Sequence, residues 1–202
     1  MARKTGNAGP NTINGTASND WLYGLAGNDT LFGRDGNDDL EGGDDNDELR
    51  GGNGADELEG GRGNDLLFGD AGNDDLEGDA GNDRLFGGAG NDSLEGGTGD
   101  DRLNGGNGRD WLEGEWGNDT LTGGKGADVF EFERGDGRDI VTDFQNGVDR
   151  LKFDDFSAAQ VQSVLDSARQ SGDDVILRLS ADTTVRIENI NRSQLTTDDF
   201  IF

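Results

Sequence analysis

Apolar side chains recur at a fixed interval through most of this chain. Every ninth residue from Leu22 to Phe130 is apolar, Leu in twelve cases and Phe in the last. The residues between them are rich in Gly, Asn and Asp, which favour turns. A period this short predicts an array in which each unit buries its apolar residue only against its neighbours.

The repeating unit is G-x-x-G-x-D-x-L-x, and thirteen copies run through residues 15–131 without insertion or deletion. Column one is Gly and column six is Asp in all thirteen copies. Column four is Gly in eleven copies, and Ser18 and Asp45 are the exceptions. Constant columns argue against a disordered acidic tail, because disorder requires a composition but no register.

Each copy is too short to form a stable strand by itself. Columns seven to nine alternate outward, inward and outward like a short strand, after six residues of turn character. Two copies must therefore form one coil of 18 residues, with a strand in each of two sheets. Column nine supports this pairing, because alternate copies carry different residues. One sheet takes Tyr23, Glu41, Glu59, Glu77, Glu95, Glu113 and Glu131, and the other takes Phe32, Arg50, Phe68, Phe86, Asn104 and Thr122.

Both ends of the array depart from the pattern. Residues 1–5 are polar and expected to fray, and residues 6–14 form a degenerate unit with Asn11 in the Asp column. After the last copy the Asp-x-apolar signature returns at Asp139 and Asp149 with longer spacing, which indicates that the array ends there. Atypical terminal repeats are expected of capped arrays. The sequence therefore divides into a capping segment at 1–14, the repeat array at 15–131 and a C-terminal part at 132–202.

The C-terminal part predicts a small mixed cap. A capping box at Ser157 opens a helix with one apolar face, and Gly172 is expected to stop it. Segments 175–179 and 185–187 alternate like strands and predict a hairpin. Residues 198–202 form a tail that is first acidic and then wholly apolar.

Charge and composition narrow the chemistry. The chain has 44 acidic and 17 basic residues, a net charge of −27, no Cys and no His. The absence of His excludes His-dependent triads and HExxH zinc sites, and the absence of Cys excludes disulfides. The acidic excess argues against nucleic acid as a partner. No segment has 18 consecutive apolar residues, so we expect no membrane span. No apolar run follows the basic residues Arg3 and Lys4, so we expect no Sec-type signal peptide.

The repeat suits a hard cation. Gly lets a loop turn its carbonyl oxygens toward one point, and the column-six Asp adds a carboxylate there. A loop stacked on the next coil would supply an all-oxygen shell, which Ca²⁺ prefers and zinc or copper does not. The apolar core is small for a chain so rich in Gly, so we expect the metal to contribute to folding itself. The gaps between stacked loops allow up to about eleven ions.

These blocks resemble the nonapeptide of the repeats-in-toxin (RTX) family over residues 6–151, and residues 152–202 resemble that family's C-terminal caps and secretion signals. The resemblance implies an all-β, right-handed parallel β-roll, a β-solenoid of 18 residues per coil, with a small C-terminal α+β cap. It also implies Ca²⁺ between the loops, export through type I secretion machinery and folding outside the cell.

The resemblance also implies which residues bind the metal. The column-six aspartates become ligands, namely Asp20, Asp29, Asp38, Asp47, Asp56, Asp65, Asp74, Asp83, Asp92, Asp101, Asp110, Asp119 and Asp128. Loop carbonyl groups join them, namely those of Gly33, Gly36, Gly42, Gly51, Gly54, Gly60, Gly63, Gly69, Gly72, Gly78, Gly81, Gly87, Gly90, Gly96, Gly99, Gly105 and Gly108.

The leading hypothesis is a secreted, extracellular and non-enzymatic calcium-binding β-roll. No pair of carboxylates lies in an evident pocket, so we expect no catalytic activity. One alternative is an accessory or secretion module of a larger extracellular enzyme such as a protease, lipase or alginate epimerase. Met1 followed by a cap-like unit favours a complete chain over that alternative. Another alternative is a surface adhesin that binds a polysaccharide.

The two outer faces of the array predict different behaviour. A ladder of Glu on the first sheet either recruits additional cations or keeps the exterior soluble. The second sheet carries a stripe that could bind an acidic polysaccharide or a second chain, unless the C-terminal cap covers it. This stripe consists of Phe32, Arg50, Leu66, Phe68, Arg84, Phe86 and Arg102.

Overall fold

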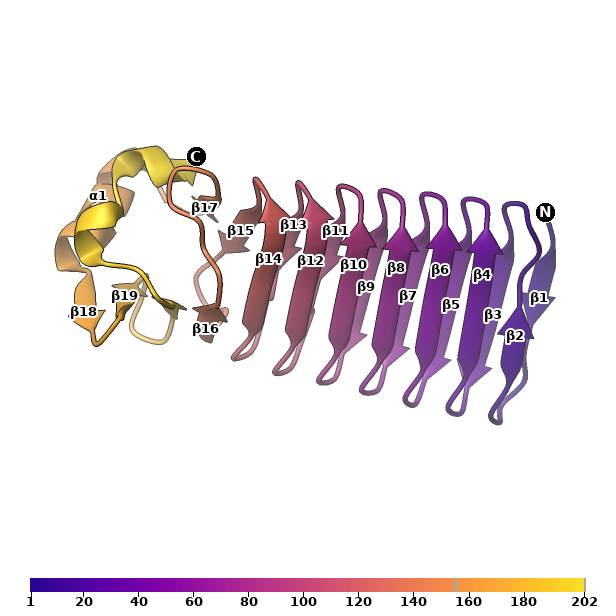
Figure 1. Cartoon of the computed structure of the whole chain (residues 1–202). Helices are drawn as coiled ribbons and strands as arrows, with labels where there is room; N and C mark the ends of the chain where they lie inside the picture. The colour runs from indigo at the N-terminus through magenta and orange to yellow at the C-terminus, as the bar shows by residue number, and fades with distance from the viewer. Residues whose placement is uncertain (155, 202) are drawn as a thin grey trace.

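The structure is a computed structural model, and it describes residues 1–154 and 156–201. Two parallel sheets face each other along a row of flat coils (Figure 1). Over residues 3–153 successive strands alternate between the sheets, and neighbouring strands within a sheet are parallel and two apart in chain order. Leu22 pairs with Leu40 and Leu40 with Leu58, so each coil has 18 residues. The predicted fold class, a β-roll with a C-terminal cap, is confirmed.

The two sheets differ in the outward-facing side chains of column nine, which are mostly Glu in one sheet and include Phe and Arg in the other. In the ten-stranded Glu sheet, Glu41, Glu59 and Glu77 lie on neighbouring strands, as predicted. Its strands are, in spatial order, β1 (Arg3–Thr5), β3 (Trp21–Ala26), β5 (Asp39–Asp44), β7 (Glu57–Arg62), β9 (Asp75–Ala80), β11 (Ser93–Glu95), β13 (Trp111–Glu113), β15 (Val129–Phe132), β17 (Arg150–Phe153) and β21 (Phe200–Ile201).

The eleven-stranded Phe/Arg sheet places Arg50, Phe68 and Phe86 on neighbouring strands, also as predicted. Its strands are, in spatial order, β2 (Thr12–Asn14), β4 (Thr30–Asp35), β6 (Glu48–Asn53), β8 (Leu66–Ala71), β10 (Arg84–Ala89), β12 (Arg102–Gly108), β14 (Thr120–Gly126), β16 (Arg138–Val141), β20 (Thr184–Ile187), β19 (Asp174–Arg178) and β18 (Arg169–Ser171).

Most strands of the array are twice as long as the sequence predicts. Pairing continues from columns seven to nine into columns one to three, where Leu25 lies beside Gly43 and Ala26 beside Asp44. Column two bends the strand through positive φ, 115° at Gly43 and 91° at Leu25, without ending the ladder. The ladder persists because it satisfies backbone groups that the loop would otherwise leave unpaired. Only columns four to six form the turn.

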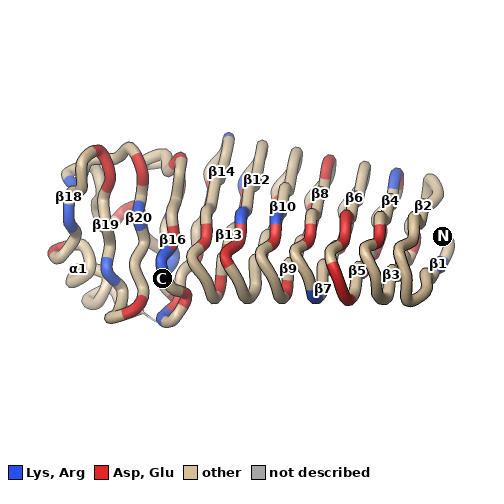
Figure 2. Tube along the Cα trace, turned by 90° about the horizontal axis from the view of Figure 1, so that it is seen from below, with Lys and Arg blue, Asp and Glu red and all other residues tan. Residues whose placement is uncertain are grey.

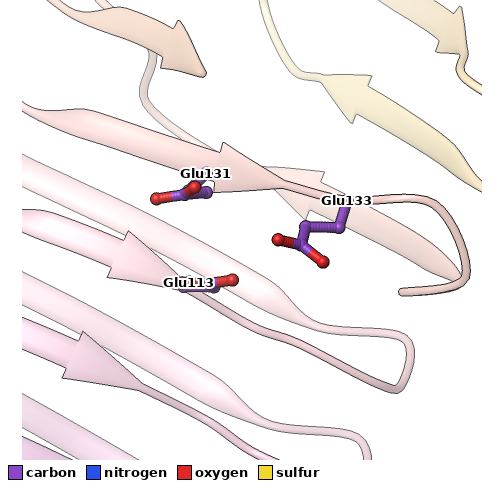
Figure 3. Close-up of side chains that lie close together, drawn as sticks. All are labelled: Glu113, Glu131 and Glu133. Atoms are coloured by element: carbon purple, nitrogen blue, oxygen red, sulfur yellow. The ribbon is translucent and has the colours of Figure 1, made fainter. Parts of the chain in front are cut away.

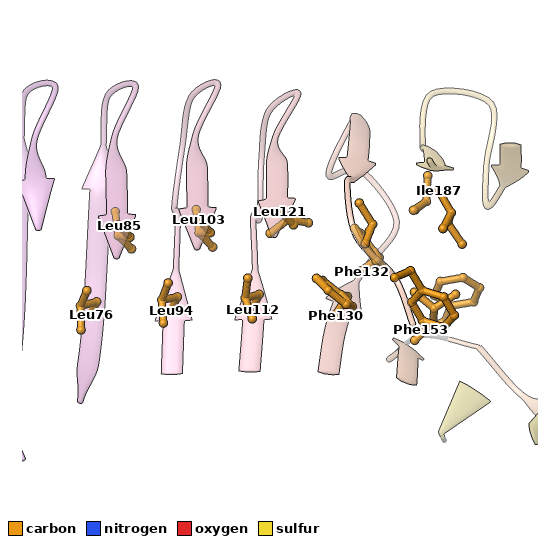
Figure 4. Close-up of a cluster of buried hydrophobic side chains, with 14 of the residues drawn as sticks. Leu76, Leu85, Leu94, Leu103, Leu112, Leu121, Phe130, Phe132, Phe153 and Ile187 are labelled. Carbon is orange, nitrogen blue, oxygen red and sulfur yellow. The ribbon is translucent and has the colours of Figure 1, made fainter. Parts of the chain in front are cut away.

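The core is a double file of leucines between the sheets (Figure 4). The twelve column-eight Leu side chains are at most 2% exposed. Toward the C-terminus Phe130, Phe132 and Phe153 replace them, and Figure 4 shows the rings gathered where the array meets the cap. The rings of Phe132 and Phe153 are 6.3 Å apart, and Phe200 packs 5.2 Å from Phe153. Aromatic rings therefore form the core at the end of the roll, where it meets the cap.

The N-terminus is ordered into the roll, so the expectation that residues 1–5 fray is wrong. Strand β1 pairs with β3 and places Lys4 beside Leu22, in the inward row that leucines occupy elsewhere. The Lys4 ammonium donates to the backbone oxygen of Asn14 on the opposite sheet. Its aliphatic stem covers the end of the core while its charge reaches a polar partner.

The C-terminal cap matches the prediction in its main parts. Helix α1 (Ala158–Ser167) follows Ser157, whose N–H donates to the Gln160 side chain at 2.9 Å, and it buries an apolar face. Strands β19 and β20 form the predicted antiparallel hairpin. The role given to Gly172 is wrong: the helix ends at Ser167, and Gly172, at φ 66°, lies in the turn between β18 and β19. The backbone leaves the helix early because Arg169 pairs with Ile176 in the sheet.

Two short 3-10 helices, η1 (Arg192–Gln194) and η2 (Thr197–Asp199), lead into β21. Strands β18 to β20 continue the Phe/Arg sheet beyond β16. Phe86 in the predicted stripe is 36% exposed, so the stripe remains open to solvent.

Phe202, the last residue of the predicted tail, lies outside the described residues. No helix in the described part of the chain is long and apolar enough to cross a bilayer.

Candidate metal centres between stacked loops

The column-six aspartates form two rows, one along each edge of the roll. Each side chain points into its own loop, and from Asp38 onward its Oδ1 accepts the backbone N–H of the aspartate one coil earlier, whereas Asp20 accepts from Ala2 and Asp29 from Asn11. Asp20 donates in this way to Asp38, and Asp29 to Asp47, both at 2.7 Å. All thirteen aspartates are buried, with at most 4% of the residue exposed. The loops therefore bring the predicted carboxylates together in two continuous rows.

The second carboxylate oxygen in these rows has no partner. A buried Oδ2 atom without a hydrogen bond is found at Asp29, Asp38, Asp47, Asp56, Asp65, Asp74, Asp83, Asp92, Asp101, Asp110, Asp119, Asp128 and Asp139. A buried carboxylate without a partner is costly, and native proteins rarely leave one. Because such oxygens repeat along each row, we infer that each row binds cations.

Column-one glycines leave room beside these oxygens. A β-carbon on Gly33 would lie 2.5 Å from Oδ2 of Asp38 and 2.6 Å from the carbonyl oxygen of Gly51 in the next coil. A side chain here would occupy the space in which the carboxylate and the carbonyl converge. The donor set is a hard carboxylate oxygen and a hard carbonyl oxygen, which fits Ca²⁺.

Column-four glycines allow the loops to stack closely. A β-carbon on Gly54 would lie 1.7 Å from the carbonyl oxygen of Gly36, and one on Gly72 would lie 1.4 Å from that of Gly54. These carbonyl groups therefore point into the gap between one loop and the next. The predicted glycine ligands belong to these two columns. Column one contributes Gly33, Gly42, Gly51, Gly60, Gly69, Gly78, Gly87, Gly96 and Gly105, and column four contributes Gly36, Gly54, Gly63, Gly72, Gly81, Gly90, Gly99 and Gly108.

Burial and mutual repulsion make these carboxylates hard to ionise without a cation. Burial, followed by the charge of the neighbouring Asp139, raises the pKa of Asp119 to about 8. Burial also raises the pKa of Asp47, Asp65 and Asp83 to about 7, with further contributions from aspartates in adjacent coils. A divalent cation in the row offsets both causes, because its charge compensates for the lost hydration and for the repulsion between neighbouring carboxylates.

These raised pKa values predict that acid stabilises the calcium-free roll. The folded chain binds protons near pH 7 that the unfolded chain, with carboxyl pKa values near 4, has already released. Stability without calcium therefore rises as pH falls from about 8 toward 4. Far-UV circular dichroism in EDTA should show more β-structure at pH 5 than at pH 8. Protons and Ca²⁺ compete, so the calcium midpoint should also rise between pH 8 and pH 6; equal midpoints would contradict the assignment.

The row that runs from Asp20 to Asp149 ends, on both sides, at a carboxylate whose second oxygen accepts hydrogen bonds from the protein, whereas the Oδ2 atoms of Asp29 and Asp139, at the ends of the other row, have no partner. Oδ2 of Asp20 accepts the Thr16 backbone N–H at 2.5 Å and the Thr16 hydroxyl at 2.8 Å. Burial acts to raise the pKa of Asp20, but these hydrogen bonds, with one from Ala2, hold it below its usual value. Oδ2 of Asp149 accepts the Gln145 N–H at 2.7 Å. Asp20 thus differs from the other predicted ligands, because both of its oxygens already have donors.

Sequence reasoning missed two contributors to the loops. Column five is Asn in nine of the thirteen copies, a signal that was available. The Asn19 side-chain oxygen accepts the Asn37 N–H at 3.1 Å, and Asn64 accepts from Asn82 at 2.8 Å, so a second ladder joins the loops. The other contributor is Asp139, which the sequence placed at the end of the array without counting it among the ligands; it extends one row and accepts the N–H of Asp119 at 3.1 Å.

The Glu sheet gathers a separate acidic cluster near the cap. Carboxylate oxygens of Glu113, Glu131 and Glu133 lie within 4.8 Å of one another (Figure 3). Burial, followed by the charge of Glu131, raises the pKa of Glu113 to about 7. Lys152 bonds to Glu131 at 2.5 Å and to Asp154 at 2.8 Å. An ammonium of the chain itself therefore already balances part of this charge.

Parallel coils with rows of unpartnered carboxylate oxygens beside loop carbonyls define a calcium-binding β-roll. Comparison with protein families agrees with this class. The chain belongs to the RTX calcium-binding nonapeptide repeat family, which matches residues 5–40, 32–67, 41–76, 68–103 and 95–130. These matches span more than half of the chain, so the predicted family is confirmed.

Two solved structures show distant similarity in fold. Extracellular lipase LipA from Serratia marcescens is 19% identical over 99% of this chain, with a TM-score of 0.40. This chain spans only 40% of that lipase. The AlgE6R3 subunit of the Azotobacter vinelandii mannuronan C5-epimerase is 24% identical over 79% of each chain, with a TM-score of 0.37. No curated protein matches the chain significantly.

Proposed function

We propose that this protein is a secreted, non-enzymatic β-roll that leaves the cell unfolded and folds outside on binding Ca²⁺. The observation that carries the proposal is the pair of rows of buried aspartate oxygens without hydrogen-bond donors. Up to about eleven ions would offset most of the net charge of −27. Sites with dissociation constants of about 10⁻⁴ to 10⁻³ M stay empty in the cytosol and fill outside.

The C-terminal tail supports export before folding. Phe200 is 5% exposed in the folded chain, and β21 pairs with β17. A type I exporter that reads this tail must therefore read it while the roll is still open. Empty calcium sites in the cytosol would keep the tail accessible, and calcium outside would then bury it.

Export can be tested in a bacterial host that carries a type I exporter for RTX proteins. The full chain is expected in the medium, and a variant that lacks residues 196–202 is expected to stay in the cells. A matched variant that lacks residues 1–5 should be exported like the full chain, because the signal is C-terminal. Retention of all three chains, or export of the C-terminally shortened one, would contradict the proposal.

A further inference from the structure

The Phe/Arg sheet contains a hollow on its outer face, over β10, β12 and β14. It has a volume of about 190 Å³ and is polar at one side and aromatic at the other. Drug-sized ligands occupy clefts of roughly 300–1,000 Å³, so this hollow suits a single ring. Its outward-facing lining residues are Arg84, Phe86, Arg102, Asn104, Thr120 and Thr122.

The aromatic side of the hollow is Phe86, which is the last ring of a stack. The Arg50 guanidinium lies 3.9 Å from the centre of the Phe68 ring, and Phe68 stacks on Phe86 at 5.1 Å with 12° between planes. The next position in register is Asn104, which is too small to cover the Phe86 ring. Phe86 is 36% exposed and lines the hollow. A ligand ring placed over Asn104 would continue the stack.

Two arginines line the other side without partners. Arg84 and Arg102 are direct neighbours in register, and both are exposed. Within residues 1–154 and 156–201 neither side chain has an ion pair or hydrogen bond, whereas Arg50 pairs with Glu48 at 3.0 Å. Like charges directly opposite in a sheet are destabilising. Figure 2 shows basic segments on both β10 and β12, although acidic residues outnumber basic ones 44 to 17 in the chain.

We propose that this hollow binds a uronic acid residue of an acidic polysaccharide. The sugar ring packs its C–H face on Phe86, and its carboxylate accepts hydrogen bonds from Arg84 and Arg102, for which guanidinium geometry is suited. Phe86 and Arg84 are two residues apart on one strand, roughly 6–7 Å, which one ring and its carboxylate can span. Asn104 and Thr120 face the ring hydroxyl groups.

Other acidic partners fit less well. Nucleic acid needs many phosphate contacts and would meet the strong negative field of the chain, while the hollow offers two unpaired cations. An acidic peptide supplies carboxylates but no rigid ring with hydroxyl groups at a fixed distance from the charge. The inference rests on the calcium-loaded roll, since the hollow exists only when β10, β12 and β14 are stacked.

Isothermal titration with tetramers of galacturonate, glucuronate and mannuronate tests the proposal on the full chain in calcium. Tetramers are used because longer polyuronates gel with calcium. At least one tetramer should bind, and its uncharged sugar counterpart should bind at least tenfold more weakly. Arg84→Gln combined with Arg102→Gln should weaken binding at least tenfold, and Phe86→Ala about fivefold. Arg62→Gln, on the Glu sheet, is the control for loss of a surface charge outside the hollow and should change binding less than twofold.

Several results would overturn the proposal. These are equal binding of the neutral tetramers, an equal loss with Arg62→Gln, or tighter binding of a short oligonucleotide. Loss of binding in Glu59→Gln with Glu77→Gln would also overturn it, because calcium bridging on the other sheet would then explain the affinity. Circular dichroism in calcium distinguishes failure of this inference from failure of the proposed function. A chain that folds in calcium but binds no uronate contradicts only this inference, whereas a chain that never folds in calcium contradicts the proposed function.

Discussion

Removing calcium with EDTA at pH 7.5 is expected to convert most of the roll into an unstructured chain. The rows of unpartnered carboxylate oxygens repel one another, and the core of single leucines is small for a chain with 37 glycines. An ion present at 10 to 100 times its dissociation constant stabilises the folded state by about 1.4–2.7 kcal/mol per site. Many sites act together in one array, so the total effect should exceed that of any single substitution.

Far-UV circular dichroism and size-exclusion chromatography measure this transition directly. The β-sheet signal should disappear and the hydrodynamic radius should increase in EDTA, and excess Ca²⁺ should restore both. Mg²⁺ is the control, because it demands octahedral geometry and loses water reluctantly. A melting temperature that does not respond to EDTA would falsify the central role given to the metal.

Gly90→Ala is expected to be among the most destabilising substitutions that add a single methyl group. The new β-carbon would lie 1.4 Å from the carbonyl oxygen of Gly72, and the backbone has φ of 144°. Neither neighbour can move alone, since both belong to stacked loops. Loss of roughly 4 kcal/mol or more in unfolding free energy is expected, together with weaker calcium binding in the adjoining coils.

The matched control for this substitution is Gly172→Ala in the cap. Gly172 also has positive φ, 66°, but a β-carbon there meets nothing within 4 Å. Only the backbone strain remains, about 1 kcal/mol. Urea denaturation of both variants in saturating calcium measures the difference. Equal losses would show that conformation alone, and not close approach of the loops, requires Gly in column four.

The periodic part of the fold was predictable because position in a coil follows directly from position in the sequence. A nine-residue repeat with one inward side chain fixes the register of both sheets, so Leu22, Leu40 and Leu58 had to align. The same reasoning placed the column-six aspartates in rows and separated Glu41 from Phe32 on opposite faces. No knowledge of distances was needed for these conclusions.

Features set by atomic contacts were not predictable in this way. The split between Oδ1, which accepts an N–H, and Oδ2, which has no partner, depends on the pitch of the loops. The order of the N-terminus depends on the Lys4 stem reaching across the core to Asn14. Gly172 was misassigned because the sequence does not show where the helix stops: Arg169 pairs with Ile176 in the sheet and does not continue the helix. The hollow beside Phe86 arises only because Asn104 is its neighbour in register.

The alternation of blocks between two sheets has a consequence for how this array can lengthen or shorten. Gain or loss of one full coil leaves every later side chain on its original face. Gain or loss of a single nonapeptide preserves the aspartate rows and the leucine file but exchanges the two exteriors from that point onward. Glu77 would then continue the line of Arg50 and Phe32. Duplication in odd numbers thus keeps the metal scaffold intact while rewriting what the surface presents.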